Sequence, residues 1–223
     1  MRPLDHTTRA PDFVVRPYQP GDREAVRRLC CDTGFLGDPI DPVFSDRELF
    51  ADYLTRYYTD VEPESSWVGV KDGKVVAYLL CCARWRQHSW WSAGNSLRLA
   101  ARGLAKLFAG RYNAASRRFI AWILWRGWRE SPAAPPRSAH MHFNALPEHR
   151  RIRMVADLVV TMLETLRQRG VKRVYGQIAT YDTRRTDRLY DYLGWKVVDK
   201  KPITKYEGLV DRRIYLSTVV KDL

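Results

Sequence analysis

The stretch MHFNALPEHRRIRMVA, Met141 to Ala156, contains the pattern that decides the fold. Its first part alternates apolar and polar residues, which predicts a strand at residues 139–146 with His140, His142 and Asn144 on one face. The pattern then changes to apolar residues at helical spacing, which predicts a long helix directly after a short loop. A strand, a basic loop and a helix therefore follow one another closely.

The junction between this strand and this helix is suited to bind a phosphate. The helix is expected to run from about residue 151 to residue 169. Its first turn has free backbone N–H groups and the positive end of the helix dipole, and both attract anions. Arg150, Arg151 and Arg153 add guanidinium groups that can bind phosphate oxygens. From the residues alone, a plain connection with solvated arginines remains the alternative.

The elements on either side of this junction make a mixed α/β pattern in a single domain at residues 13–223, after a loose leader at residues 1–12. Asp72-Gly73 between two apolar runs is a strong signal for a two-residue β-hairpin. The predicted order is strand, helix, helix, strand, strand, a helical stretch, strand, helix, strand, helix, strand, strand. The strands are expected at residues 13–18, 67–70, 75–82, 139–146, 174–178, 196–198 and 213–219.

The net charge of +13 is concentrated in one part of the chain. Residues 73–129 contain no Asp or Glu, but they carry eleven Lys and Arg residues and six of the eight Trp residues. An amphipathic helix is expected at Ser96 to Phe108 and a second, more apolar helix from Ser116, until Pro132 to Pro136 ends the run. Such a local excess of cations implies an anionic substrate, a membrane surface or an acidic partner.

Composition excludes several classes of protein. Hydrophobic residues make up 45% and charged residues 28%, which favours a globular core over a disordered chain. No apolar run reaches the roughly 18 residues that a membrane-spanning helix needs, and the N-terminus lacks the apolar region of a signal peptide, so a cytoplasmic protein is expected. The adjacent cysteine pairs Cys30-Cys31 and Cys81-Cys82 lack metal-ligand spacing, so we expect reduced core residues and no metal.

Two blocks of the sequence together resemble the GNAT superfamily of acyl-CoA-dependent N-acetyltransferases. Pro147-x-x-Arg150 followed by a helix resembles the family's pyrophosphate-binding loop, Arg/Gln-x-x-Gly-x-Gly/Ala. TRRTDRLYDYLGW, Thr183 to Trp195, is similar to the later Asn-x-x-Ala-x-x-Leu-Tyr-x-x-Leu-Gly-Phe. The resemblance covers residues 14–220 outside a basic helical insertion at residues 85–137. It implies the GNAT fold, a twisted and mostly antiparallel sheet with helices on both faces.

The resemblance implies acetyl-CoA, or another acyl-CoA, as co-substrate. Arg150 takes the family's Arg/Gln position, and main-chain groups of Ala145 and Leu146 would bind the pantetheine arm. Thr183 stands where the family usually has Asn. The pyrophosphate would lie against the backbone of Arg151, Ile152, Arg153, Met154 and Val155. Of these, Arg153 and Val155 replace glycines that normally let the backbone approach the phosphates, and Arg153 would either compensate or block the pocket.

The resemblance also implies candidates for the proton transfers. The tyrosine that returns a proton to the leaving thiolate falls on Tyr190, whose alternative role is packing of its helix on the sheet. His142 and Asn144 lie beside the cofactor and are candidates for the base, with a packed, hydrogen-bonded role as the alternative. Weaker candidates lie in the segment that lines the acceptor cleft in this family: Tyr57, Tyr58 and Glu62.

The function that the resemblance implies is acetyl transfer to a primary amine of a small molecule or a peptide. The cations of the insertion favour an acceptor with an anionic group, with residues from about Trp85 to Arg129 bordering its entrance. A non-catalytic module that binds a membrane surface or an anionic ligand is the alternative, and a homodimer contact is also open. Nucleic-acid binding rests on composition alone and is disfavoured.

Overall fold

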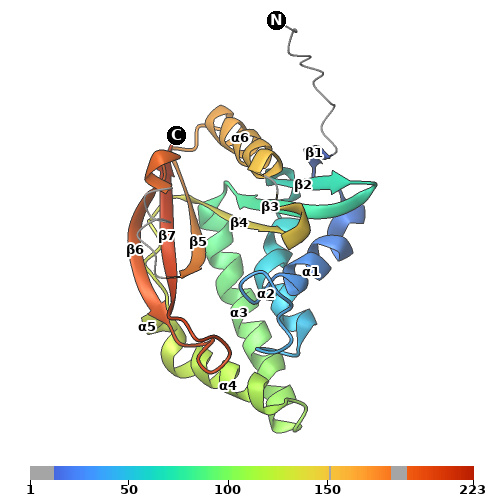
Figure 1. Ribbon diagram of the computed structural model, residues 1–223, viewed down its shortest axis with the longest axis vertical. Coiled ribbons are helices and arrows are strands. Elements are labelled where there is room, and N and C mark those ends of the chain that lie inside the picture. The colour runs from blue at the N-terminus through green and yellow to red at the C-terminus, as the bar shows by residue number, and fades with distance from the viewer. Residues whose placement is uncertain (1–12, 151, 182–189) are drawn as a thin grey trace, which may run out of the picture.

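The computed structural model describes residues 13–150, 152–181 and 190–223. Seven strands within these ranges form one sheet, in the order β1-β2-β3-β4-β5-β7-β6 (Figure 1). Neighbouring strands are antiparallel except β4 and β5, which are parallel, so the expected mixed α/β class and mostly antiparallel sheet are confirmed. The strands are β1 (Val14–Pro17), β2 (Ser66–Lys71), β3 (Lys74–Cys82), β4 (Ala139–Ala145), β5 (Arg173–Tyr181), β6 (Lys196–Ile203) and β7 (Ile214–Asp222).

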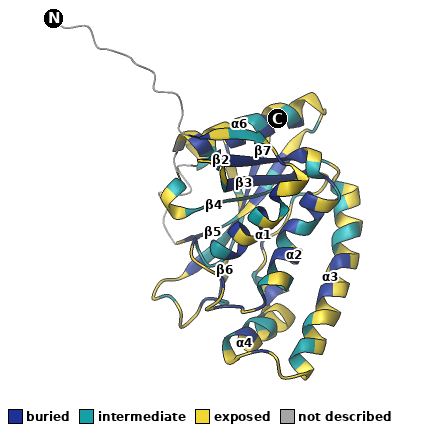
Figure 2. Ribbon diagram, turned by 90° about the vertical axis from the view of Figure 1, so that its right-hand side faces the viewer, coloured by how far each residue is buried: buried dark blue, intermediate teal, exposed yellow. Residues whose placement is uncertain are grey.

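Helices cover both faces of the sheet (Figures 1 and 2). On one face lie α1 (Arg23–Asp32), α2 (Arg47–Asp60) and α3 (Trp85–Phe108), and on the other lies α6 (Ile152–Gln168). After α3 come α4 (Ala114–Trp122), the π-helical turn η3 (Ile123–Gly127) and the short α5 (Trp128–Glu130). Three 3-10 turns complete the set: η1 (Pro20–Asp22), η2 (Pro63–Ser65) and η4 (Pro147–His149).

The core has two main layers because β3 is buried on both faces. Leu79 and Cys81 point toward α6 and join its apolar side. Tyr78 and Leu80 point the other way and pack against α1 and α2. Alternate residues of a strand face opposite sides, so one apolar strand supplies both layers. All four cysteines of the chain are buried thiols without a disulfide, as expected.

The turn and the helix ends that the sequence predicted from single residues are present in the structure. Asp72 and Gly73 have φ angles of 48° and 73°, the left-handed pair that a tight hairpin needs. The carboxylate of Asp46 accepts a hydrogen bond from the Leu49 N–H and caps α2. Gly170 has a φ of 70° just after α6, where a left-handed residue commonly ends a helix.

The helix expected from Ser96 begins eleven residues earlier, at Trp85. Its first turns pack on α2: the His88 and Trp91 rings meet the Tyr57 ring with centroids 4.6 Å and 5.4 Å apart. The buried stripe continues through Asn95. Two of these inward residues, His88 and Asn95, are polar, so apolar periodicity alone could not detect the start of the helix. No helix in the described ranges has the length and apolar character needed to cross a membrane.

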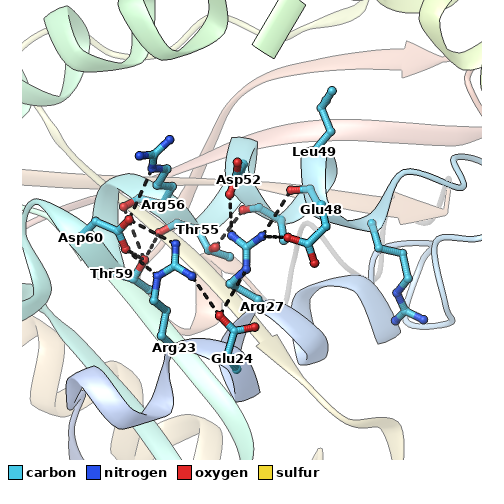
Figure 3. A network of polar contacts seen from close by, with 12 residues as sticks. Arg23, Glu24, Arg27, Glu48, Leu49, Asp52, Thr55, Arg56, Thr59 and Asp60 are labelled. Atoms are coloured by element: carbon cyan, nitrogen blue, oxygen red, sulfur yellow. Dashed lines mark hydrogen bonds and ion pairs between the residues drawn. The ribbon is translucent and has the colours of Figure 1, made fainter. Parts of the chain in front are cut away.

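Acidic residues of α2 balance several cations of α3. The Asp52 carboxylate accepts hydrogen bonds from Arg27 of α1 at 2.6 Å and from Arg102 of α3 at 3.1 Å. Arg27 also pairs with Glu48, which extends the network between α1 and α2 (Figure 3). Arg102 joins α3 to the same network through Asp52. Lys106 of α3 lies 2.6 Å from the Asp46 carboxylate. Part of the charge that suggested an external anion is therefore neutralised inside the chain.

The far end of the insertion packs against two loops. Phe44 from the α1–α2 connection meets Tyr112 and Phe119 with ring centroids 5.6 Å and 5.1 Å apart. Tyr206 from the β6–β7 connection belongs to the same buried cluster. The Glu130 carboxylate accepts a hydrogen bond from the Thr204 N–H at 2.7 Å. The insertion thus bridges from α2 to the end of the β6–β7 hairpin, as α4 and α5 show in Figure 1.

Candidate active site

The parallel strands β4 and β5 are paired over only part of their length. Their register ends at Met141 and Gly176, although β4 continues to Ala145 and β5 to Tyr181. Beyond that point the strands diverge (Figure 1). Main-chain groups along this gap lack the partners that a continuous sheet would give them, and buried main-chain groups require partners. The gap can therefore accept a ligand that hydrogen-bonds along the strand.

The hydrogen bonds between β3 and β4 identify the groups that face the gap. The Leu146 N–H donates to the Val76 carbonyl at 3.0 Å, and the Leu146 carbonyl accepts from the His149 N–H at 2.9 Å. In an antiparallel ladder every second residue points its main-chain N–H and C=O toward the neighbouring strand, and the residues between point theirs the other way. Because Leu146 bonds β3, the main-chain groups of Phe143 and Ala145 point away from β3 and face the gap. Both main-chain groups of Leu146 are used within the chain. Phe143 therefore has its main-chain groups on the side of the gap, a position that the sequence reasoning did not name.

Arg150 is held at the open end of the gap. Its Nε donates to the Ala145 carbonyl at 3.0 Å. Its guanidinium lies against Gly37 of the α1–α2 connection, where a Cβ would come within 2.6 Å of Nη2. Gly37 has a φ of 109°, which glycine adopts without strain. An exposed cation is therefore positioned where the strand ends and α6 begins.

The first turn of α6 lies at this end of the gap, and its side chains differ in burial. Arg153 is exposed, whereas Met154 is only 2% exposed and packs against Gly69 in the core. Val155 is half-buried. The N–H groups of this turn have no partner within the helix and can bind an anion. Arg151 and Thr183 lie outside the described residues.

The expected proton donor and base lie toward opposite faces of the sheet. Tyr190, half-buried, packs against the core layer that includes α6, and its carbonyl accepts from the Trp195 N–H at 2.8 Å. His142 lies on the face covered by α2, with its ring centroid 5.5 Å from that of Tyr78. Its Nδ1 is buried and has no hydrogen-bond partner among the described residues. Burial lowers the pKa of His142 to about 4, so the ring is neutral at pH 7.

Asn144 has a partner within the chain. Its Nδ2 donates to the Tyr78 hydroxyl at 2.8 Å, and both residues sit under α1 and α2. Burial raises the pKa of Tyr78 well above its usual value, so the hydroxyl keeps its proton. An amide fixed in this way is suited to orient a neighbour, and it has no basic atom with which to take a proton from an amine.

A cavity of about 350 Å³ lies at the paired end of β4 and β5, on the face that α2 and α3 cover. His140 and Tyr175, partners in the β4–β5 register, form its floor. The two ends of the insertion form its walls. The lining residues are Cys82, Trp85, His88, Ser89, Ala134, Pro135, Pro136, Arg137, Ser138, His140 and Tyr175.

One tyrosine hydroxyl joins the two histidines of this cavity. The Tyr58 hydroxyl lies 2.5 Å from His140 Nδ1 and 3.4 Å from His88 Nε2. Burial lowers the pKa of His140 to about 3 and also lowers the pKa of His88, so both rings are neutral at pH 7. Sequence reasoning named Tyr58 but not His88, because the first turns of α3, which carry His88, were not predicted as helix.

The other two weaker candidates, Tyr57 and Glu62, form a buried hydrogen-bond network near the start of α3. Glu62 is fully buried, and its carboxylate accepts from the Tyr57 hydroxyl at 2.8 Å and from the Ala83 N–H at 2.7 Å. Ser65 donates a third hydrogen bond at 2.7 Å. A carboxylate with its oxygens occupied in this way anchors the start of α3. Within the described residues, no group of three or more potential ligands could hold a metal ion.

Solved structures share this architecture. A protein named SsHAT is 26% identical, with 95% of this chain and 98% of that chain covered and a TM-score of 0.56. The apo form of an agmatine N-acetyltransferase mutant is 15% identical, with 95% and 100% covered and a TM-score of 0.55. A Salmonella typhimurium protein, assigned as an acetyltransferase and solved with its cofactor acetyl-CoA, is 14% identical, with 95% and 94% covered and a TM-score of 0.53.

No protein-family model matches the chain, and no curated protein matches it in sequence. The agreement therefore lies in the order of strands and helices over nearly the whole chain. The sheet with a parallel β4–β5 pair and the helix that follows β4 are the parts that the sequence motifs indicated. The resemblance drawn from the sequence is thus confirmed at the level of the fold: the chain has the GNAT fold, that of N-acetyltransferases.

Proposed function

We propose that the chain is an acyl-CoA-dependent N-acyltransferase that transfers an acetyl group from acetyl-CoA to a primary amine. The observation that carries the proposal is the gap between β4 and β5, with the first turn of α6 at its open end. The solved Salmonella typhimurium structure of the same fold holds acetyl-CoA, and the agmatine N-acetyltransferase is named for an amine acceptor. Both support this donor and this class of acceptor.

The described residues fit the donor. The main-chain groups of Phe143 and the N–H of Ala145 would bind the pantetheine arm along β4, while the Ala145 carbonyl accepts from Arg150 Nε. The pyrophosphate would lie at the first turn of α6, against the backbone of residues 151–155 and the guanidinium groups of Arg150 and Arg153. Thr183, which stands where the family's motif usually has Asn, is a further candidate for contact with the donor. Acetyl-CoA supplies the activated acyl group, and the chain supplies its orientation.

The protein's own part in the reaction is to move two protons. The amine nitrogen forms a bond to the thioester carbon as the carbon–sulfur bond breaks, so the amine must lose a proton and the thiolate must gain one. In our proposal Tyr190 donates to the thiolate, since a phenol on a packed helix can be held in one position. His142 is one candidate for the base because its Nδ1 is neutral and without a partner among the described residues. Asn144 would orient the site through Tyr78.

Thermal unfolding with and without acetyl-CoA tests the proposal. Ligand at about 100 times its dissociation constant stabilises the folded state by about 2.7 kcal/mol, which raises the Tm by several degrees. Arg153→Glu should abolish the rise because it sets a negative charge against the pyrophosphate. Arg167→Glu makes the same charge change in the last turn of α6 and should keep the rise. A full rise with Arg153→Glu would show that the phosphates bind elsewhere.

Binding to an anionic membrane surface is the second candidate. Trp90, Phe108 and Trp125 are 82%, 87% and 74% exposed, and all three lie in the acid-free stretch of the chain. Exposed Trp beside Arg is typical of segments that bind the membrane interface. Co-sedimentation with anionic but not neutral vesicles would support it, and Trp90→Ser with Trp125→Ser should then abolish the association.

A further inference from the structure

We propose that the 350 Å³ cavity is the acceptor site, that it takes a small monoamine bearing a carboxylate, and that His88, Tyr58 and His140 form the path by which the amine loses its proton. The inference rests on the proposed function, because it assigns the second substrate of that reaction. It also gives the insertion a role, since His88 lies in α3.

The position of the cavity follows from the geometry of the two strands. From Ala145 to Met141, β4 covers four residues, or roughly 13 Å at about 3.3 Å per residue. An arm that enters at the α6 end and lies along this length reaches the point where β4 and β5 join. His140 and Tyr175, the pair just before that point, line the cavity. The acyl group would therefore arrive at the cavity's edge.

The proton path follows from the hydrogen bonds of Tyr58. A hydroxyl carries one hydrogen, so Tyr58 donates to one of the two imidazoles and accepts from the other. A proton that either ring takes from the amine can then move to the other ring through the hydroxyl. As the nitrogen–carbon bond forms and the carbon–sulfur bond breaks, the amine proton enters this path and Tyr190 protonates the thiolate. His142, one β4 pleat away on the same face, would be the alternative entry point.

The charge of the lining selects the acceptor. Arg137 is the one charged residue among the described lining residues, and no Asp or Glu joins it. The carboxylate of Glu62 is fully buried and its oxygens already accept hydrogen bonds. A second ammonium group, as in a polyamine, would meet no carboxylate among these lining residues. A carboxylate would instead pair with the Arg137 guanidinium.

The shape of the cavity limits the size of the acceptor. A volume of about 350 Å³ is at the small end of sites for small molecules and leaves no room for a folded protein segment. Trp85, Pro135 and Tyr175 give it apolar walls. An amino acid with an apolar side chain presents all three features: one amine, one carboxylate and an apolar body. L-Phenylalanine is therefore a suitable probe.

Steady-state kinetics with acetyl-CoA and three acceptors test the assignment, with release of CoA as the readout. L-Phenylalanine should exceed spermidine in kcat/KM by at least tenfold. Arg137→Ser should raise KM for phenylalanine but not for phenylalaninamide, which lacks the carboxylate. His88→Gln should lower kcat about 100-fold, the order expected for a lost proton path, and leave the acetyl-CoA rise in Tm unchanged. Preference for spermidine, or an unchanged kcat in His88→Gln, would overturn the proposal.

Calorimetric titration with phenylalanine, with and without CoA, gives a readout independent of turnover. Ser89→Trp places a large side chain on a lining position and should abolish binding. Ser96→Trp, exposed on the same helix but away from the cavity, is the matched control and should bind normally. Equal binding by both variants would place the acceptor elsewhere. If acetyl-CoA still raises the Tm in that case, the proposed function stands and only the acceptor site is wrong.

Discussion

Replacing Asp52 by Asn removes a negative charge that pairs with arginines of both α1 and α3. The Asp52 side chain is 12% exposed, and it pairs with Arg27, whose side chain is 6% exposed, at 2.6 Å. It also pairs with Arg102 at 3.1 Å, but that guanidinium is 44% exposed. Removing one partner of a buried ion pair costs about 3–5 kcal/mol, whereas exposed pairs contribute about 1 kcal/mol or less.

Two features of the site reduce this cost. Arg27 keeps its ion pair with Glu48, and Asn retains one oxygen that can accept from the guanidinium. We therefore expect Asp52→Asn to lower the free energy of unfolding by about 2–3 kcal/mol, below the full penalty for an isolated charge. For a chain of this length that corresponds to a fall in Tm of roughly 5–10 °C.

Urea denaturation of the wild type and two variants measures the effect. Asp60→Asn is the matched control, because Asp60 also pairs with an α1 arginine, Arg23, but both side chains are about one-third exposed. It should cost less than about 1 kcal/mol. Asp52→Asn must lower the midpoint without a change in the slope for the comparison to hold. If both variants cost the same, the α1–α2–α3 network does not stabilise the fold as argued.

Three further predictions concern the site. Tyr190→Phe should lower kcat with any substrate found and leave acetyl-CoA affinity unchanged, as single-turnover kinetics and thermal shifts would show; unchanged turnover would mean that another group protonates the thiolate. Gly37→Ala should weaken acetyl-CoA binding by displacing Arg150. Gly73→Ala, also at a positive φ but with open space around it, should lower stability alone, and equal acetyl-CoA affinity in both variants would refute this. The folded pKa of His140 is about 3, below its unfolded value of about 6.5, so its contribution to stability is present above pH 6.5 and lost as the pH falls toward 3. The free energy of unfolding of His140→Gln, measured by urea titration, should therefore fall less steeply than that of the wild type between pH 6.5 and 4. Parallel curves would contradict this.

The parts of the fold that sequence predicted are those set by local chemistry. The Asp72-Gly73 turn needs two left-handed residues in a row, which few other pairs adopt, so two residues identify the hairpin. The strand, loop and helix from Ala139 to Gln168 follow from one change of apolar period. Residues from 182 to 189, which carry Thr183, belong to the second motif but lie outside the described residues.

The parts that sequence missed depend on contacts between distant segments. Tyr58 and His140 are 82 residues apart, and His88 comes from a third element, so no window of sequence contains the cavity. The hydrogen bonds of the Leu146 main chain to Val76 and His149 likewise depend on how β4 pairs with β3 and on the turn that follows, which the sequence pattern does not give. The start of α3 could not be predicted because the side of the helix that packs against α2 includes polar residues such as His88.

The cations of the insertion differ in whether they have a partner within the chain, and this decides which of them could attract a ligand. Lys106 and Arg102 face acids of α2, so they hold the helix in place and are not free to attract a ligand. Arg117 and Arg118 are exposed on α4, which does not line the cavity, and they form no ion pair among the described residues. Among the described lining residues of the cavity, Arg137 is the one that carries charge. An acceptor's carboxylate would therefore meet the Arg137 guanidinium, so its selection would depend on that single pairing more than on the overall charge of the segment.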